Sequence, residues 1–235
     1  MAAFFRKHQF HGFLLHWEYP IGVAEEHTNL AEEMKEAFAK EVKKNRCATS
    51  PAHCCCASRK KKTTDGSYNV QSIGNFDLLF LMSYDLHGFR KVHGKFYPTE
   101  GETTGIDEFT ANYWLSKGVP KRKAIIGISV YSRGWTLGIP SRTATIETEG
   151  SRPLSPSITN PVGGTAAYWE ICKYMKESGG EIMDGQGVGT YMRKWLKKKG
   201  YGGAFKWTLD FDDFKGMNCG KGPNALLNAT SNEMR

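Results

Sequence analysis

The fold is decided by an apolar run with the length of one buried strand, Phe76-Asp-Leu-Leu-Phe-Leu-Met-Ser-Tyr84. Similar apolar runs predict further strands, at 10–19, 124–131 and 203–209. Apolar residues at helical spacing predict the helices between them, at 25–44, 107–117, 165–176 and 191–199. Gly118 is predicted to cap the second of these helices. Strands that alternate with helices of this length predict an α/β fold with a parallel sheet.

The composition is that of a globular chain. Of 235 residues, 40% are hydrophobic and 24% are charged, which excludes wholesale disorder. The mean hydropathy is −0.49 and no apolar run approaches ~18 residues, so no transmembrane helix and no membrane partner are expected. Much of the net charge of +8 lies in the runs Arg59–Lys62 and Lys197–Lys199. These runs lack interleaved aromatic residues, so they predict solvated surface and no nucleic-acid partner.

The six cysteines do not form a metal-binding motif. Cys54, Cys55 and Cys56 are consecutive and no Cys-x-x-Cys pair occurs, so the spacings of zinc ribbons and thiol-redox sites are absent. Three consecutive cysteines cannot all face one ion without a contorted backbone. They predict a short segment of small buried side chains instead, and we expect no metal and no cofactor.

The predicted strands end in acidic, aromatic and basic residues. In parallel α/β folds the chemistry lies at the carboxyl ends of the strands. Those ends are Glu18-Tyr19, Tyr84-Asp85, Tyr131-Ser132-Arg133 and Trp207-Thr208-Leu209-Asp210. Carboxylates can transfer protons and aromatic rings offer flat faces to sugars, so this pattern indicates a carbohydrate site.

Four segments end at or include these strand ends. In chain order they are Phe10-His-Gly-Phe-Leu-Leu-His-Trp-Glu-Tyr-Pro20, Leu81-Met-Ser-Tyr-Asp-Leu-His-Gly88, Ile126-Gly-Ile-Ser-Val-Tyr-Ser-Arg133 and Gly202-Gly-Ala-Phe-Lys-Trp-Thr-Leu-Asp-Phe-Asp-Asp213. They resemble the strands FDGxDxDWEYP, MxYDxHG, GxPxYGR and GGxxxWxxDxDD of glycoside hydrolase family 18, the chitinases and chitinase-like lectins. The resemblance extends from about Phe10 to about Leu227.

The resemblance implies a partial TIM (β/α)8 barrel with a small α+β insertion after strand seven. The matching segments correspond to strands four to eight, so we expect the N-terminal three strands to be missing and the sheet to keep two open edges. One domain is expected over 1–235, incomplete at its N-terminus, with the insertion shortened to 139–189. A fragment, a splice form and a gene-model error are open explanations. Segment 47–62, where strand five should fall, fits the pattern least.

The family activity implied is substrate-assisted, retaining hydrolysis of β-1,4-linked N-acetylglucosamine polymers. Glu18 stands at the position of the general acid, but His11, Leu14 and His16 replace the three signature aspartates. An aspartate at position 16 would orient the substrate's acetamide group and balance the growing positive charge. Loss of one such electrostatic partner costs ~2.7–4 kcal/mol. We therefore expect hydrolysis to be lost or strongly impaired, and whether the chain is an enzyme stays open.

Other positions match residues that contact the substrate in the family. Tyr84 matches the tyrosine that positions the acetamide group, Trp207 the floor beneath the sugar and Met82 a packing residue under that floor. The remaining predicted substrate-binding residues are Asp85, Tyr131 and Arg133. Asp210, Asp212 and Asp213 are predicted to form a structural loop after the last strand.

The resemblance also implies a disulfide between Cys172 and Cys219, which needs an oxidising compartment. We therefore expect an extracellular protein, although the first residues do not form a signal peptide. Asn228-Ala229-Thr230 is a glycosylation sequon that matters only on the secretory route. The expected partner is chitin or an N-acetylglucosamine oligosaccharide, bound by a monomer. A non-catalytic chitin-binding lectin and a non-functional truncated fragment are the alternatives.

Overall fold

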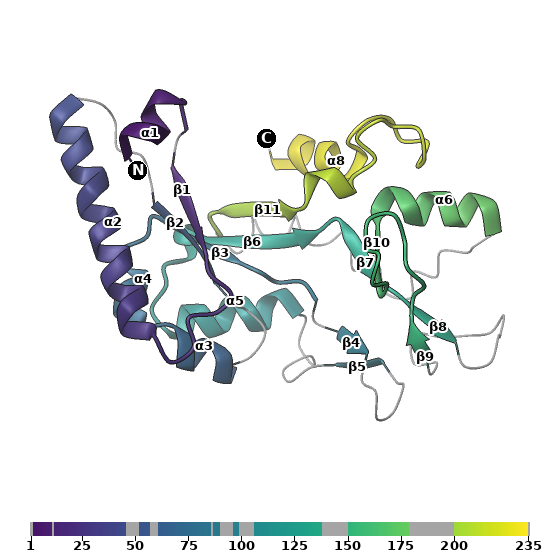
Figure 1. Ribbon diagram of the computed structural model, residues 1–235, viewed down its shortest axis with the longest axis horizontal. Coiled ribbons are helices and arrows are strands. Elements are labelled where there is room, and N and C mark those ends of the chain that lie inside the picture. The colour runs from purple at the N-terminus through teal and green to yellow at the C-terminus, as the bar shows by residue number, and fades with distance from the viewer. Residues whose placement is uncertain are drawn as a thin grey trace. The chain divides into compact units, whose positions relative to one another are not determined.

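The computed structural model of the chain describes residues 2–10, 12–45, 52–56, 61–85, 87–89, 96–98, 106–137, 150–178 and 200–234 (Figure 1). The chain divides into two compact units. The first unit comprises Met1–Ser83, Glu100–Gly127 and Gly200–Phe205, and the second comprises Tyr84–Thr99, Ile128–Lys199 and Lys206–Arg235. No helix in the described part of the chain is long and apolar enough to cross a membrane.

A five-stranded sheet has the order β1-β2-β3-β6-β11. Its strands are β1 (Phe13–His16), β2 (Ala52–Cys56), β3 (Leu78–Leu81), β6 (Ala124–Ser129) and β11 (Gly203–Trp207). The pairs β1–β2, β2–β3 and β3–β6 are parallel. Neighbours in the sheet are also neighbours in chain order among these strands, as expected for barrel strands four to eight. The predicted parallel α/β sheet is therefore confirmed.

The observed strands β1, β3, β6 and β11 lie inside the apolar runs that predicted them but are shorter than those runs. Leu79 and Leu81 of β3 are buried, as are Ala124 and Ile126 of β6, because these strands form the apolar centre of the sheet. Strand β2 occupies the segment with the least clear pattern, where His53 pairs with Leu14 on one side and Leu78 on the other. The strand expected there by resemblance is thus present. The structure does not describe the side chains of Cys54, Cys55 and Cys56, so their predicted burial stays a prediction.

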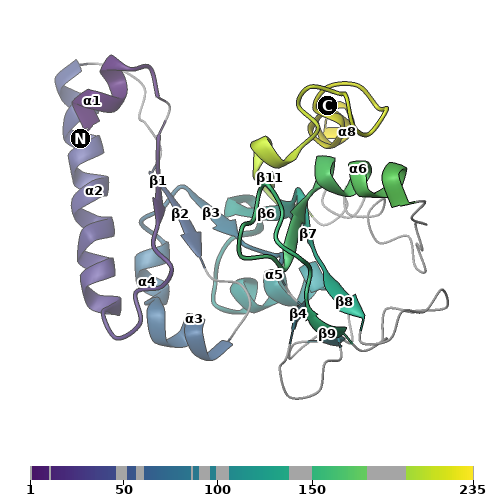
Figure 2. The same ribbon diagram turned by 45° about the vertical axis from the view of Figure 1, so that its right-hand side comes forward.

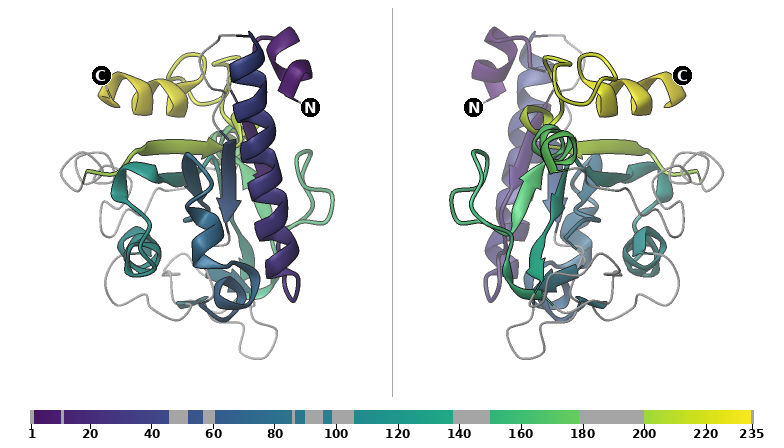
Figure 3. Two further views of the ribbon diagram at one scale, coloured as in Figure 1. Left: turned by 90° about the vertical axis from the view of Figure 1, so that its left-hand side faces the viewer. Right: turned by 90° about the vertical axis from the view of Figure 1, so that its right-hand side faces the viewer.

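The first unit also contains helices. They are α1 (Ala2–Lys7), α2 (Ala24–Asn45), α3 (Lys61–Ser67), α4 (Val70–Ile73), α5 (Ile106–Ser116) and the 3₁₀ turn η2 (Lys121–Lys123). Helix α2 buries Ala31, Met34 and Phe38, which recur at helical spacing, and Figure 3 shows it beside β2. Gly118 follows α5 with φ 89°, which confirms the predicted C-cap. Helix α1 was not expected.

In its described residues, the second unit contains antiparallel strand pairs and the helices α6 and α8 (Figure 2). Its elements are β4 (His87–Phe89), β5 (Phe96–Pro98), β7 (Tyr131–Arg133), β8 (Trp135–Leu137), β9 (Gly150–Pro153), β10 (Thr165–Ala167), α6 (Tyr168–Ser178), the turn η3 (Leu209–Phe211) and α8 (Ala225–Met234). The helix predicted from Thr165 begins only at Tyr168, because Thr165–Ala167 pair with β7. The helix predicted over 191–199 lies outside the described residues, as do 139–149 and 179–189 of the expected insertion.

Buried Glu170 holds the start of α6 to the preceding loop. Its carboxylate accepts hydrogen bonds from the Ala167 N–H at 2.9 Å, the Thr159 N–H at 3.1 Å and the Ser157 hydroxyl at 3.2 Å. Burial alone would raise the pKa of Glu170, but the hydrogen bonds from Thr159, Ala167 and Ser157 outweigh it and lower that pKa. The ionised carboxylate thereby links the end of β10 and the start of α6 to the loop that contains Ser157 and Thr159.

Candidate functional site

Glu18 lies just beyond β1, in the first unit. Leu14, His16 and Glu18 are exposed, whereas Phe13 and Leu15 are half-buried, as strand alternation requires. The Nε2 atom of His16 lies 2.7 Å from Oε1 of Glu18, which is hydrogen-bond distance. Exposure thus alternates along β1, and the contact joins the candidate acid to an imidazole. His11 lies outside the described residues.

A hydrogen bond and packed aromatic rings hold the segment that carries Glu18 in place. The Tyr68 hydroxyl donates to the Trp17 carbonyl at 3.3 Å, and Pro20 is fully buried. His27 on α2 is buried between the rings of Trp17 and Tyr68, with centroids 6.2 and 5.2 Å away. Tyr68 and His27 therefore position the Glu18 segment, and neither lies in a motif singled out from the sequence. An aromatic residue at the end of a short polar helix gives no local signal of such a role.

Met82 follows β3 in the first unit and is buried, with 7% of its surface exposed. The neighbouring Ser83 hydroxyl donates to the Gly127 carbonyl at 2.8 Å and so ties the end of β3 to β6. Burial is what a packing residue requires. The predicted place of Met82 under a sugar-binding floor stays a prediction.

The second unit brings together Asp85 and Arg133. Arg133 Nε donates to Asp85 Oδ1 at 2.6 Å, and its terminal nitrogen donates to Oδ2, so the pair is bidentate. These hydrogen bonds raise the pKa of Arg133, against the effect of its partial burial. Asp85 has φ 58°, in the left-handed region that residues other than glycine rarely occupy. Such backbone outliers concentrate at ligand sites, where surrounding contacts hold them in place.

Aromatic rings adjoin this ion pair. The ring of Tyr131 lies edge-on to those of Tyr84 and Phe211, with centroids 6.2 and 6.1 Å apart. Trp207, also in the second unit, is 40% exposed, which is high for a residue of this size, and its carbonyl accepts from the Val130 N–H at 2.9 Å. Of the predicted residues, the second unit thus holds Tyr84, Asp85, Tyr131, Arg133 and Trp207. Phe211 was missed, because it stands at a variable position of the last resembling segment.

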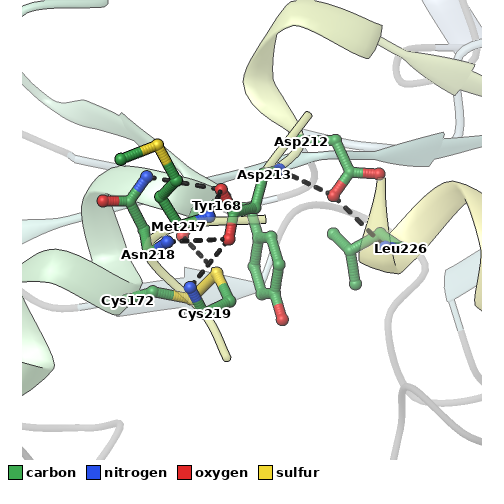
Figure 4. The surroundings of a disulfide bond; sticks show 8 residues. All are labelled: Tyr168, Cys172, Asp212, Asp213, Met217, Asn218, Cys219 and Leu226. Atoms are coloured by element: carbon green, nitrogen blue, oxygen red, sulfur yellow. Dashed lines mark hydrogen bonds between the residues drawn. A yellow bond between two sulfur atoms is a disulfide. The ribbon is translucent and has the colours of Figure 1, made fainter. Parts of the chain in front are cut away.

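Asp212 is a structural carboxylate. It is fully buried, and it accepts hydrogen bonds at the start of α8, from the Leu226 N–H at 3.2 Å (Figure 4) and from the Leu227 N–H at 2.8 Å. Amide groups in the first turn of a helix lack partners inside the helix, so this carboxylate satisfies two of them. Burial raises the pKa of nearby Tyr168, and the carboxylate charges of Asp212 and Asp213 raise it further.

Asp213 organises the loop that carries Cys219. It is 1% exposed and accepts from the N–H groups of Met217, Asn218 and Cys219 at 3.2, 3.0 and 2.8 Å, as Figure 4 shows. Burial alone would raise the pKa of Asp213, but these hydrogen bonds outweigh it and lower that pKa. The predicted structural loop is confirmed for Asp212 and Asp213, whereas Asp210 is exposed.

The predicted disulfide is present. Cys172 on α6 is bonded to Cys219 with an S–S distance of 2.05 Å and a Cα–Cα distance of 5.1 Å (Figure 4). The bond joins α6 to the loop that Asp213 organises. Among the described residues, no group of three or more His, Cys, Asp or Glu side chains could hold a metal ion.

A pocket of about 380 Å³ lies in the first unit, away from the predicted site residues. Its lining residues are Thr64, Asp65, Tyr68, Asn69, Tyr113, Trp114 and Lys117. Lys117 Nζ lies 2.7 Å from Asp65, and the Tyr113 hydroxyl donates to the same carboxylate. The polar side chains at this wall are thus engaged with one another.

Comparison with known proteins identifies the family. The family model described as "Glycosyl hydrolases family 18" matches residues 1–212. An endochitinase of Brugia malayi is 56% identical over 99% of this chain, which spans 51% of that protein. Human YKL-39, described as a pseudo-chitinase with retained chitooligosaccharide binding properties, is 28% identical with a TM-score of 0.84, covering 99% of this chain and 71% of the other.

A further solved structure, the immunomodulatory active chitinase TsES1 of Trichuris suis, is 26% identical with a TM-score of 0.85, covering 100% of this chain and 72% of the other. These neighbours are TIM-barrel proteins of one family, and the five-stranded parallel sheet agrees with the predicted partial barrel. The chain spans about half the length of the Brugia malayi relative. With its strand ends, its sheet and the match over residues 1–212 in agreement, the chain belongs to glycosyl hydrolase family 18.

Proposed function

We propose that this chain is a chitinase-family domain that binds chitooligosaccharides and has lost most of its capacity to hydrolyse them. One observation carries the proposal: the 2.7 Å contact between His16 Nε2 and Glu18 Oε1, where the family pattern has an aspartate. The family is one of glycosidases, and the description of human YKL-39 supports binding without hydrolysis as an outcome within it.

The His16–Glu18 contact opposes general-acid catalysis in two arrangements of its proton. When protonated His16 donates to an ionised Glu18, the carboxylate has no proton to give to a glycosidic oxygen. When Glu18 donates, its proton is already bound to the imidazole nitrogen and must leave that hydrogen bond before it can be transferred. A general acid needs its proton free at the reacting atom, so this pair works against the first chemical step.

His16 also lacks the negative charge that substrate assistance uses. A neutral imidazole offers one acceptor nitrogen, and a protonated imidazole would oppose the positive charge that grows at the sugar. Leu14 adds no charge on the same face of β1. Loss of a preorganised partner of this kind costs ~2.7–4 kcal/mol, or two to three decades in rate.

Sugar binding is supported by features of the second unit alone. Trp207 is partly exposed and offers an aromatic side chain of the kind that stacks on a pyranose, and Asp85 and Arg133 offer a fixed pair of charged groups for hydroxyls. Tyr84 and Tyr131 adjoin one another, as neighbouring walls of a cleft require. The roles of these residues toward acetamide and ring are those that the resemblance implies.

Binding is tested by the thermal melt of the full protein with and without the N-acetylglucosamine tetramer. We expect an upward shift for the wild type, because a ligand at a hundred times its Kd adds about 2.7 kcal/mol. Trp207→Ala should reduce affinity at least tenfold, while Phe214→Ala, which removes another half-exposed aromatic ring of the second unit, should leave it unchanged. A wild-type melt without any ligand shift contradicts binding. The absence of a cooperative melt favours the non-functional fragment.

Hydrolysis is tested by restoring the aspartates. The double variant Leu14→Asp/His16→Asp should cleave a fluorogenic chitooligosaccharide about a hundredfold or more faster than the wild type, because one preorganised electrostatic partner is worth about two to three decades in rate. Adding Glu18→Gln should abolish that gain, since the amide has no acidic proton. A double variant that stays as slow as its parent, while it still binds the tetramer, contradicts our explanation of the defect.

An extracellular location belongs to the same proposal. The Cys172–Cys219 bond supports it, because disulfides form and persist in oxidising compartments. A monomeric state, and one domain over 1–235 with a shortened insertion at 139–189, stay predictions. Sedimentation of the purified protein measures the first, and limited proteolysis measures the second.

A further inference from the structure

Helix α8 carries a sequon that the carbohydrate site does not use. Asn228-Ala229-Thr230 has the Asn-X-Thr pattern of N-linked glycosylation, and no other Asn-X-Ser/Thr triplet with X other than proline occurs in the sequence. Asn228 and Ala229 are both exposed in the second unit. A single exposed acceptor makes any N-linked oligosaccharide on this chain assignable to one atom, Nδ2 of Asn228.

The folded helix can carry an oligosaccharide without losing a contact. Asn228 Nδ2 donates to the Pro223 carbonyl at 2.9 Å. A side-chain amide has two N–H bonds and glycosylation replaces one, so the other can keep this hydrogen bond. The Thr230 hydroxyl donates to the Leu226 carbonyl at 2.9 Å, within the helix, and needs no rearrangement after modification.

The attachment of α8 to the rest of the second unit that Asp212 provides does not involve the side chain of Asn228. Asp212 receives the N–H groups of Leu226 and Leu227, so the first turn of the helix is attached through its backbone. Leu226 and Leu227 are half-buried, whereas Asn228 is exposed. A bulky group on the exposed Asn228 would therefore extend into solvent and leave this attachment intact.

N-linked glycosylation and disulfide formation take place in the same compartment. Cys172–Cys219 lies in the same unit, and the lumen that forms disulfides in secreted proteins is the one in which sequons are modified. This inference rests on the extracellular location proposed above. It does not rest on chitooligosaccharide binding, which involves other residues.

We propose that Asn228 is an N-glycosylation site. The Asn228 Nδ2 atom forms a bond to the anomeric carbon of a lipid-diphosphate-linked oligosaccharide. The bond between that carbon and the diphosphate oxygen breaks, and the lipid diphosphate leaves with the bonding electrons. Nδ2 loses one proton, and nothing is oxidised or reduced.

The test is expression of the full chain, behind a cleavable leader peptide, in eukaryotic cells. Wild type and Thr230→Ser both keep a sequon and should lose mass on treatment with peptide N-glycosidase, which leaves an aspartate at position 228. Asn228→Gln and Thr230→Ala should show no such change. The oligosaccharide is transferred before folding is complete. The mass change can therefore be measured on protein retained in the cell as well as on protein in the medium.

An unmodified Asn228 in wild-type chains whose leader has been removed overturns the proposal, because those chains have entered the compartment. A mass change that persists in both Asn228→Gln and Thr230→Ala overturns it as well, since the sugar is then elsewhere. Melts of enzymatically deglycosylated protein with the N-acetylglucosamine tetramer separate the two proposals: sugar binding can fail while Asn228 is modified, and the reverse.

Discussion

Replacing Asp213 by alanine is expected to destabilise the second unit strongly. The Asp213 carboxylate is 1% exposed and accepts four hydrogen bonds: from the N–H groups of Met217, Asn218 and Cys219, and from Asn218 Nδ2 at 3.3 Å. Alanine removes every acceptor at once. The three backbone N–H groups, whose hydrogen bonds to this carboxylate are partly buried, are then left without their partner.

The expected loss follows from these contacts. A buried donor left without a partner costs about 1–3 kcal/mol, so three donors in the lower half of that range amount to about 3–6 kcal/mol. This is a large part of the 5–15 kcal/mol that usually separates folded from unfolded protein. For a chain of this length each kcal/mol lowers Tm by about 2–4 °C, so we expect Tm to fall by roughly 10 °C.

Denaturant titration of wild type, Asp213→Ala and Asp210→Ala measures this effect. Asp210 lies three residues earlier and is exposed, so Asp210→Ala should stay within about 0.5 kcal/mol of wild type. Since the hydrogen bonds lower the pKa of Asp213, its contribution is complete above the unfolded pKa of about 3.9 and is lost as pH falls below it. Asp213→Ala should therefore approach wild-type stability in acid. Equal stability of the two variants at pH 7 would refute the reasoning.

Three further changes have defined outcomes. Cys172→Ser opens a disulfide with a sequence separation of 47 and should cost about 4 kcal/mol by loop entropy, measured as a lower denaturation midpoint that reductant reproduces in the wild type. Hydrogen bonds lower the pKa of Glu170, so Glu170→Gln should lower stability at pH 7 and flatten its loss below about pH 4.5. Burial lowers the pKa of Lys206 to about 8, so wild-type stability should rise from pH 8 to 10.5, where the unfolded chain binds more protons. Lys206→Met should remove that rise in a pH series of melts; a variant curve parallel to the wild type contradicts it.

Strands β3 and β10 differ in whether their own residues predict them. Strand β3 is an apolar run whose burial follows from its own residues, so its position was predictable. Strand β10 has only three residues and precedes a helix directly, so its pattern merges with that of α6. It forms because Tyr131–Arg133 provide a partner for it, and no local signal contains that partner.

The candidate site divides in the same way. Residue identities at the strand ends, including the replacements His16 and Leu14, were readable directly, since they depend on chemical type and chain position alone. The supporting contacts were not: the Tyr68 hydroxyl on the Trp17 carbonyl joins residues 51 positions apart. Phe211 beside Tyr131 is a second example of a pair made only by folding.

Apolar periodicity and motif spacing are properties of short segments, so the parallel α/β sheet, the family and the loss of the signature aspartates could be predicted from the sequence. Folding alone brings His16 to Glu18 and Arg133 to Asp85, and it gives Asp213 its backbone donors. Each of these depends on where a side chain lies in relation to atoms of other segments. Hydrogen bonds and ion pairs act over about 3–4 Å, so their partners are known only once the chain has folded.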